Sequence, residues 1–245
     1  MLMLQSDLHG NHLLGALPAR EWQALMPDLE LVQLRTDQLL CDSGQRIQHV
    51  YFPATAIISL LHTMEDGSSS EIAAVGREGM TGVPILTGGE TMPTRVQVQC
   101  PGYAYRMNAH ALREHFRRSD FLQRLILLYM QALLTQVAQT AACNRHHSIS
   151  TQLCRWLLID IDRTLSDELP VTHQLIALML GVRREGVTEA AGQLHAAGLI
   201  YHSRGSIKVL DREGLEARAC ECYGIVRREF DRLLPRVRIA EADAA

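Results

Sequence analysis

Residues 171–205, VTHQLIALMLGVRREGVTEAAGQLHAAGLIYHSRG, carry the pattern that decides the fold. Thr172 can cap a first helix, because its hydroxyl can accept a hydrogen bond from a backbone N–H of the first turn. Gly181 stands where that helix must stop and reverse, a position that favours a residue with positive φ. A second helix then opens at Arg183. The spacing predicts a helix-turn-helix.

Apolar residues in both expected helices recur at helical spacing, which predicts their buried faces. The expected buried set is Ile176, Ala177, Met179, Leu180, Val187, Ala190, Ala191 and Leu194. Residues 201–209 alternate around Ser203-Arg204-Gly205, as in a hairpin that would form a wing. The opposite face of the second helix is polar and suits base edges and phosphates in a DNA major groove. The alternative is a pair of amphipathic helices in an ordinary core, with their charges facing water.

This stretch resembles the winged-helix domain of the Crp/Fnr family of bacterial transcription regulators. The resemblance rests on Thr172, Gln174, Ile176, Ala177, Gly181, Arg184, Glu185, Val187, Gly198, Leu199, Ile200 and Gly205. It implies an α+β fold with an N-terminal β-roll sensor domain, a long dimerising helix and the C-terminal winged helix-turn-helix. It also implies three partners: double-stranded DNA, a second copy of the chain and RNA polymerase.

In this family an arginine–glutamate pair at the start of the recognition helix reads bases, which by resemblance assigns that role to Arg184 and Glu185. Glu189 stands where the best-known members have a further basic residue, so the DNA sequence recognised is expected to differ. Gly186 replaces a threonine that contacts phosphate in many members. The residues expected at the DNA are Thr172, His173, Arg183, Arg184, Glu185, Thr188, Glu189, Arg204 and Lys208.

Composition is that of a soluble globular protein: 245 residues, 47% hydrophobic, 21% charged and a net charge of −3. Basic residues exceed acidic ones only locally, by four to two within 170–210. The N-terminus lacks a signal peptide pattern. The most apolar run, 125–134, is far below the ~20 residues needed to cross a bilayer. We therefore expect a cytoplasmic protein without a membrane partner, whose six cysteines are reduced thiols.

Period-two alternation between 29 and 105, with turn signals at roughly ten-residue spacing, predicts a barrel or double-sheet roll. Strands are expected near 30–34, 38–41, 47–52, 56–63, 69–75, 94–99 and 102–107. Short helices are expected over 18–26 and 108–116. Further helices are expected from residue 148 or 150 to about 164, and as one final helix from 212 to about 234.

A long helix is expected from Ser119 to about Asn144, apolar on two faces and therefore in need of two partners. One partner would be the roll of its own chain, and the other the same helix of a second subunit. The seam expected between subunits, at alternating spacings of four and three, is Leu122, Ile126, Tyr129, Leu133, Gln136 and Thr140. The expected domains are 1–118 (sensor), 119–147 (dimerisation helix and hinge) and 148–245 (DNA-binding).

Cyclic-nucleotide members of the family carry a Gly-Glu pair for the ribose and an arginine for the phosphate. In this chain Val83 follows Gly82, and Pro93-Thr94 stands where the arginine would fall. Arg95 is one register step away, on the other face of a strand. We therefore expect the roll to bind a ligand other than cyclic AMP, or none. The expected effector pocket comprises Gly82, Val83, Pro84, Thr94 and Arg95.

No cofactor and no metal ligands are expected. An iron–sulfur cluster is rejected because the first 40 residues contain no cysteine. The segment 143–147 and Cys154 are interpreted as structural, and Cys220 and Cys222 would point about 200° apart around a helix. A haem ligand from His49, His62 or a cysteine stays open. An enzyme of the cupin type would need a His-x-His pair, which is missing, and a DNA-binding protein with a purely structural roll remains the third interpretation.

Overall fold

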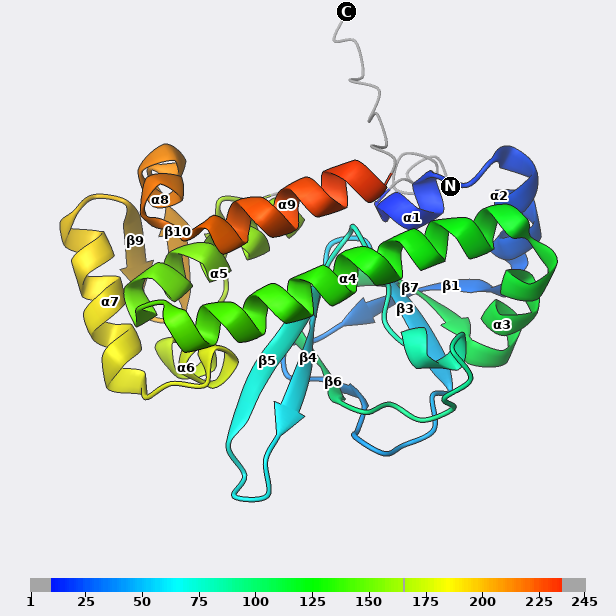
Figure 1. The fold of residues 1–245 in the computed structure, drawn as a ribbon, viewed down its shortest axis with the longest axis horizontal. Helices are drawn as coiled ribbons and strands as arrows, with labels where there is room; N and C mark the ends of the chain where they lie inside the picture. The colour runs from blue at the N-terminus through cyan, green and yellow to red at the C-terminus, as the bar shows by residue number, and fades with distance from the viewer. Residues whose placement is uncertain (1–9, 165, 235–245) are drawn as a thin grey trace, which may run out of the picture.

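The computed structural model describes residues 10–164 and 166–234. An antiparallel β-roll occupies one end of the molecule and a winged-helix unit the other (Figure 1). The α+β architecture expected from the sequence is confirmed. The strands of the roll are β1 (Leu29–Leu34), β2 (Leu39–Cys41), β3 (His49–Pro53), β4 (Ile57–Thr63), β5 (Ser69–Val75), β6 (Arg95–Cys100) and β7 (Gly102–Asn108).

Two sheets face each other in the roll, in the orders β1-β7-β3 and β2-β6-β4-β5. Each neighbouring pair is antiparallel, with Leu31 opposite Tyr105 in the first sheet and Leu60 opposite Val96 in the second. Alternate side chains point to opposite faces of a strand, so the period-two pattern of the sequence fills the space between the sheets. Val50, Phe52 and Val98 are buried in this core.

Short helices close the roll at its ends: α1 (His12–Gly15), α2 (Ala19–Leu25) and α3 (Ala109–Arg118), with the 3₁₀ turns η2 (Met26–Asp28) and η3 (Val83–Ile85). Two of them begin at asparagine caps. The side chain of Asn11 accepts from the backbone N–H of Leu13 and Leu14, and that of Asn108 from His110 and Ala111. These bonds satisfy backbone donors that have no partner within the helix.

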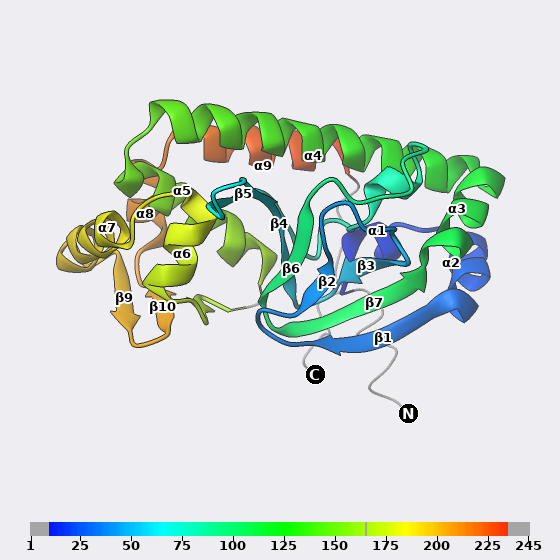
Figure 2. The same ribbon diagram turned by 90° about the horizontal axis from the view of Figure 1, so that it is seen from below.

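The longest helix, α4 (Asp120–His146), runs across the roll and reaches the winged-helix unit at its C-terminal end (Figures 1 and 2). Ser119 caps it by accepting from the backbone N–H of Leu122 at 3.1 Å. By length and composition α4 could cross a membrane. Its apolar character has another source in this fold, because Leu122, Leu125 and Ile126 belong to the core of the roll.

The face of α4 expected to meet a second subunit is instead buried within its own chain, so the predicted subunit seam is wrong. Tyr129 donates to the carbonyl of Met80 at 2.8 Å, and Gln136 donates to that of Ala74 at 3.1 Å. The five buried members of the expected seam are Leu122, Ile126, Tyr129, Gln136 and Thr140, and Leu133 packs against the same core from a half-buried position.

A different face of α4 is exposed. Leu127 and Leu134 are 54% and 67% exposed, and Ala138 and Ala141 continue the same stripe. Together with Gln131 these residues repeat at spacings of four and three. A helix that is apolar all round offers two such patterns, and only packing against the roll decides which one is left outside.

The winged-helix unit consists of α5 (Ile149–Arg163), α6 (His173–Leu180), α7 (Arg184–Ala196) and a sheet ordered β8-β10-β9. Its strands are β8 (Glu168–Leu169), β9 (Ile200–Ser203) and β10 (Ser206–Val209). Their core joins apolar residues of α5, α6, α7 and the wing with Ile57, Leu61 and Ala74 of the roll. The two ends of the molecule are therefore packed together, with α6 against β5.

The C-terminal segment forms two helices where the sequence suggested one. These are α8 (Arg212–Arg218) and α9 (Glu221–Leu233), separated by Ala219 and Cys220 with extended backbone (ψ 156° and 164°). α9 then lies along α4, where Phe230 meets Tyr129 edge to face with ring centroids 6.4 Å apart. Packing against α4 requires α9 to change direction after α8, which a continuous apolar pattern does not reveal.

Candidate DNA-binding interface

The turn between α6 and α7 has the geometry that the sequence predicted. Thr172 accepts from the backbone N–H of Leu175 at 3.1 Å and so caps α6. Gly181 ends α6 in the left-handed region (φ 65°, ψ 36°), and the following Val182 donates to the carbonyl of Ala177 at 3.0 Å. This left-handed cap reverses the chain and starts α7 at a fixed angle to α6.

α7 buries one face and exposes the other. Val187, Ala190, Ala191 and Leu194 are at most 4% exposed and pack against α5 and α6. Arg183, which is the N-cap residue, and the helical Arg184, Glu185, Thr188 and Glu189 are exposed. The polar face that the sequence predicted for the second helix is therefore open to solvent. A polar helix face of this kind can enter a major groove, where guanidinium groups reach guanine edges and phosphates.

Hydrogen bonds within the helix-turn-helix hold two of the expected contact residues in place. The hydroxyl of Thr188 donates to the carbonyl of Arg184 at 3.0 Å and lies 3.2 Å from Nδ1 of His173. Partial burial, with the charges of His202 and Arg184 nearby, lowers the pKa of His173. A neutral His173 with a protonated Nδ1 can donate to Thr188 and leave Nε2 as an acceptor. Thr172, His173 and Thr188 thus shape the surface beside the arginines.

The wing lies next to this face. Arg204 is exposed in the turn between β9 and β10, and Lys208 on β10 forms an ion pair with Asp167 at 3.3 Å. The rings of His195 on α7 and His202 on β9 meet edge to face, with centroids 4.9 Å apart. Arg204 therefore presents its charge at the tip of the wing, while the charge of Lys208 is partly offset by Asp167.

The residues expected to form an effector pocket are spread over different environments. Gly82 is buried with left-handed backbone (φ 84°), and a Cβ there would lie 2.6 Å from Val50. Val83 and Pro84 are half-buried in η3, and Thr94 is buried. Arg95 forms a two-pronged ion pair with Asp42, with N–O distances of 3.1 and 3.3 Å. The hydrogen bond from Arg95 lowers the pKa of Asp42, so the carboxylate neutralises this guanidinium.

A cleft of about 410 Å³ lies on the roll, between β3, η3 and the start of α3. None of the five residues expected in the effector pocket lines it. Its charged lining consists of Arg46, Arg113 and Glu90. Both arginines form ion pairs with Glu90, and the lining also contains His49 and His110. The effector pocket expected from the sequence therefore stays a prediction, because those five residues do not line this cleft.

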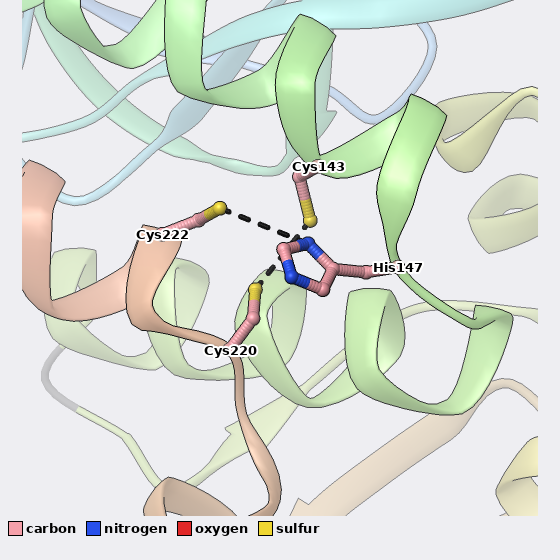
Figure 3. Close-up of side chains that lie close together, drawn as sticks. All are labelled: Cys143, His147, Cys220 and Cys222. Carbon is pink, nitrogen blue, oxygen red and sulfur yellow. Dashed lines mark hydrogen bonds between the residues drawn. The ribbon is translucent and has the colours of Figure 1, made fainter.

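A group of residues that the sequence analysis set aside comes together where α4, α5 and α9 meet. Cys143, His147, Cys220 and Cys222 each direct one potential ligand atom to the same place, and these atoms all lie within 4.8 Å of one another (Figure 3). The expectation that Cys220 and Cys222 diverge is wrong, because it assumed a continuous helix. Cys220 is the extended N-cap residue of α9, so its thiol is free to turn toward that of Cys222.

Known families cover most of this architecture. Residues 31–119 match the model of a family described as a cyclic nucleotide-binding domain. Residues 151–218 match the model of a family described as a Crp-like helix-turn-helix domain. None of the curated protein sequences is similar enough to count as a match. The chain belongs to the Crp/Fnr family of transcription regulators, which bind DNA through a helix-turn-helix domain and are not enzymes.

Solved structures of similar fold include a CRP-family transcriptional regulator from Thermus thermophilus, at 17% identity, covering 77% of this chain and 96% of that one with a TM-score of 0.65. FixK2 from Bradyrhizobium japonicum is 15% identical, and the match covers 78% of this chain and 98% of FixK2 with a TM-score of 0.65. The c-di-GMP-responsive regulator CLP from Xanthomonas campestris is 15% identical, and the match covers 78% of this chain and 99% of CLP with a TM-score of 0.61. At these identities the likeness concerns the fold.

Proposed function

We propose that this protein binds a pseudo-palindromic operator as a homodimer, with α7 of each subunit in the major groove. The observation that carries the proposal is the exposed polar face of α7 beside an exposed wing. Two such helices read half-sites one turn of DNA apart, about 34 Å, when a two-fold axis relates them. The family as a whole binds DNA and acts as dimers.

Within this interface we assign base contacts to Arg184 and Glu185. An arginine can contact guanine O6 and N7 with two hydrogen bonds, and a carboxylate can accept from the cytosine amino group. Arg183 and Arg204 suit phosphates on either side of the groove. Glu189, exposed one turn after Glu185, repels phosphate and is expected to shift the preferred sequence.

The dimer contact is assigned to the exposed stripe of α4: Leu127, Leu134, Ala138 and Ala141. Small and apolar side chains at spacings of four and three suit the packing of one helix against a second copy. The division of the chain into 1–118, 119–147 and 148–245 places this helix between the sensor and the DNA-binding unit. A change at the hinge after α4 would then alter the separation of the two recognition helices.

For the roll we propose a signal other than cyclic AMP. A cyclic phosphate needs a positive partner, since burying it unpaired is costly, and Arg95 is already paired with Asp42. One protein of the same fold, CLP, responds to c-di-GMP, so this architecture serves more than one ligand. A ligand-dependent rise in melting temperature would identify a sensing roll, and no rise with any candidate would favour a structural one.

We also propose that the protein is cytoplasmic and acts together with RNA polymerase. The decisive experiment is selection of bound fragments from genomic DNA at two salt concentrations. The expected result is a consensus with two inverted half-sites and an affinity that falls as salt rises, because phosphate contacts release counterions. Binding without a consensus, or to a single half-site, would contradict the proposal.

Small-angle scattering with and without candidate effectors tests the proposed change at the hinge after α4. Altered DNA affinity with an unchanged shape would count against that change.

A further inference from the structure

The four residues that converge beside the hinge are held by two helix ends. Cys143 is in the last turn of α4. His147 is the C-cap residue of that helix, and its backbone N–H donates to the carbonyl of Cys143 at 3.0 Å. Cys220 and Cys222 open α9. The three cysteines are 0%, 8% and 2% exposed and form a cluster separate from both hydrophobic cores. Figure 3 shows their side chains pointing toward one another around the imidazole ring.

The distances between these atoms suit a small tetrahedral ion. In a tetrahedral zinc site, bond lengths of about 2.3 Å to sulfur and about 2.0 Å to nitrogen separate two sulfurs by about 3.8 Å, and a sulfur from a nitrogen by about 3.5 Å. Here the sulfurs of Cys143 and Cys220 are 3.6 Å apart, and Sγ of Cys222 is 3.8 Å from Nδ1 of His147. An ion at the centre needs only small side-chain movements to reach all four ligands.

Groups around the cluster match the needs of a zinc–thiolate centre. Nε2 of His147 lies 3.5 Å from a carboxylate oxygen of Glu221, which leaves Nδ1 to face the sulfurs. Metal-bound histidines commonly hold their second ring nitrogen in this way. Buried Arg155 lies next to the Cys143 thiol and donates to Thr140 at 3.1 Å. A doubly charged cation bound by three thiolates forms a centre with a net charge of −1, and the positive charge of Arg155 balances it.

We propose that Cys143, His147, Cys220 and Cys222 bind one Zn²⁺ ion, and that this Cys₃His site fastens the start of α9 to the hinge after α4. Three thiols release their protons to solvent on binding, and neutral His147 donates its Nδ1 lone pair. Tetrahedral coordination by sulfur and nitrogen favours zinc over the oxygen-seeking cations. His147, with 23% of its side chain exposed, gives the ion a path from solvent. The site is separate from the DNA-binding face and does not depend on the proposed operator contacts.

The test uses the full chain, purified without a polyhistidine tag under reducing conditions, with metals counted by mass spectrometry. The expected result is one zinc ion per chain, lost in Cys222→Ser and in Cys220→Ser. Cys154→Ala is the matched control, because Cys154 is equally buried on the neighbouring α5 but lies outside the cluster, and it should keep the ion. Circular dichroism establishes whether each variant is folded.

A second measurement does not depend on how the variants fold. Wild-type protein stripped by a chelator is titrated with Co²⁺, which should give the visible absorption of tetrahedral cobalt–thiolate and be displaced by one equivalent of Zn²⁺. Stripping should also lower the melting temperature of the wild type and of Cys154→Ala. Reduced wild-type protein that takes up neither ion would overturn the proposal. So would a Cys143–Cys220 disulfide found by peptide mapping of protein trapped directly from cells.

Discussion

Two exposed helix faces offer this chain contacts with other molecules, and they differ in chemistry. On α7 the exposed residues include Arg183, Arg184 and Glu185, whereas on α4 they include Leu127 and Leu134. A polar face gains little from meeting its own copy, whereas its guanidinium and carboxylate groups can hydrogen-bond base edges in a DNA groove. An apolar face gains by being covered, at roughly 25 cal/mol for each Å² removed from water. The difference separates a DNA contact from a subunit contact within one chain.

The largest effect is expected where the apolar face is broken. Leu134→Glu places a charge in the proposed contact between two α4 helices and should yield monomers by analytical ultracentrifugation. DNA affinity should fall by at least ~100-fold, because linked binding of two half-sites is lost. Leu39→Glu is the control, since Leu39 is 48% exposed on β2, away from α4. A dimer that survives Leu134→Glu would show that this face is not the subunit contact.

A smaller effect is expected on the charged face. Arg184→Ala should weaken binding to the preferred operator by ~1–3 kcal/mol, or about 5- to 150-fold, if the side chain contacts a base. Discrimination at one base pair of each half-site should relax, as measured by fluorescence anisotropy on a set of operator variants. Arg118→Ala, an exposed arginine on α3, should leave binding unchanged. An equal loss on every DNA sequence would reduce Arg184 to a phosphate contact.

The turn that positions the charged face can be tested separately from the apolar face. Gly181→Ala should lower the free energy of unfolding by ~1–2 kcal/mol, because a residue with a Cβ is strained at φ 65°. The dimer should persist while DNA affinity falls. Gly192→Ala in the middle of α7 is the matched control. Outside its own stretch of helix backbone, nothing lies within 4 Å of a Cβ at this position, and the change should stabilise by ~0.5–1 kcal/mol. Equal destabilisation by both changes would contradict the role given to the left-handed turn.

The smallest effect concerns a polar network that joins the roll, α4 and α5. Arg163 donates to Glu78 at 2.7 Å and to Gln136 at 2.9 Å, and Gln99 donates to Asp160. Burial, and then the charge of Glu71, raises the pKa of Asp160 well above its ordinary value. The folded state therefore binds a proton that the unfolded state releases above about pH 4. Stability should fall as pH rises from there toward the raised pKa.

Asp160→Asn should flatten this fall, because the amide oxygen still accepts from Gln99 and no longer ionises. Urea unfolding at several pH values measures the change in slope. Glu65→Gln, at an exposed turn, should leave the slope as in the wild type. An Asp160→Asn protein with the wild-type slope would mean that Asp160 is charged throughout, paired with Arg163, whose NH1 is 3.8 Å away.

The sequence correctly predicted those elements whose residue pattern is compatible with only one position and one buried face. All seven strands of the roll lie within about two residues of their expected positions, because alternation and turns together fix a strand. The buried face of α7 was correct down to Val187 and Leu194, because charges mark the opposite side. α4 had no such mark. Both its faces are apolar, so the face covered by the roll could not be told from the face left outside.

What the sequence by itself determined was therefore local: the capped helices, the paired strands and the turn at Gly181, each set by a few neighbouring residues. The tertiary structure decided which side of α4 stays exposed and where α8 gives way to α9. It also brought Cys143 and His147 to Cys220 and Cys222, from segments far apart in the chain. Such contacts depend on how separate elements pack, and no periodicity within one element records the position of another.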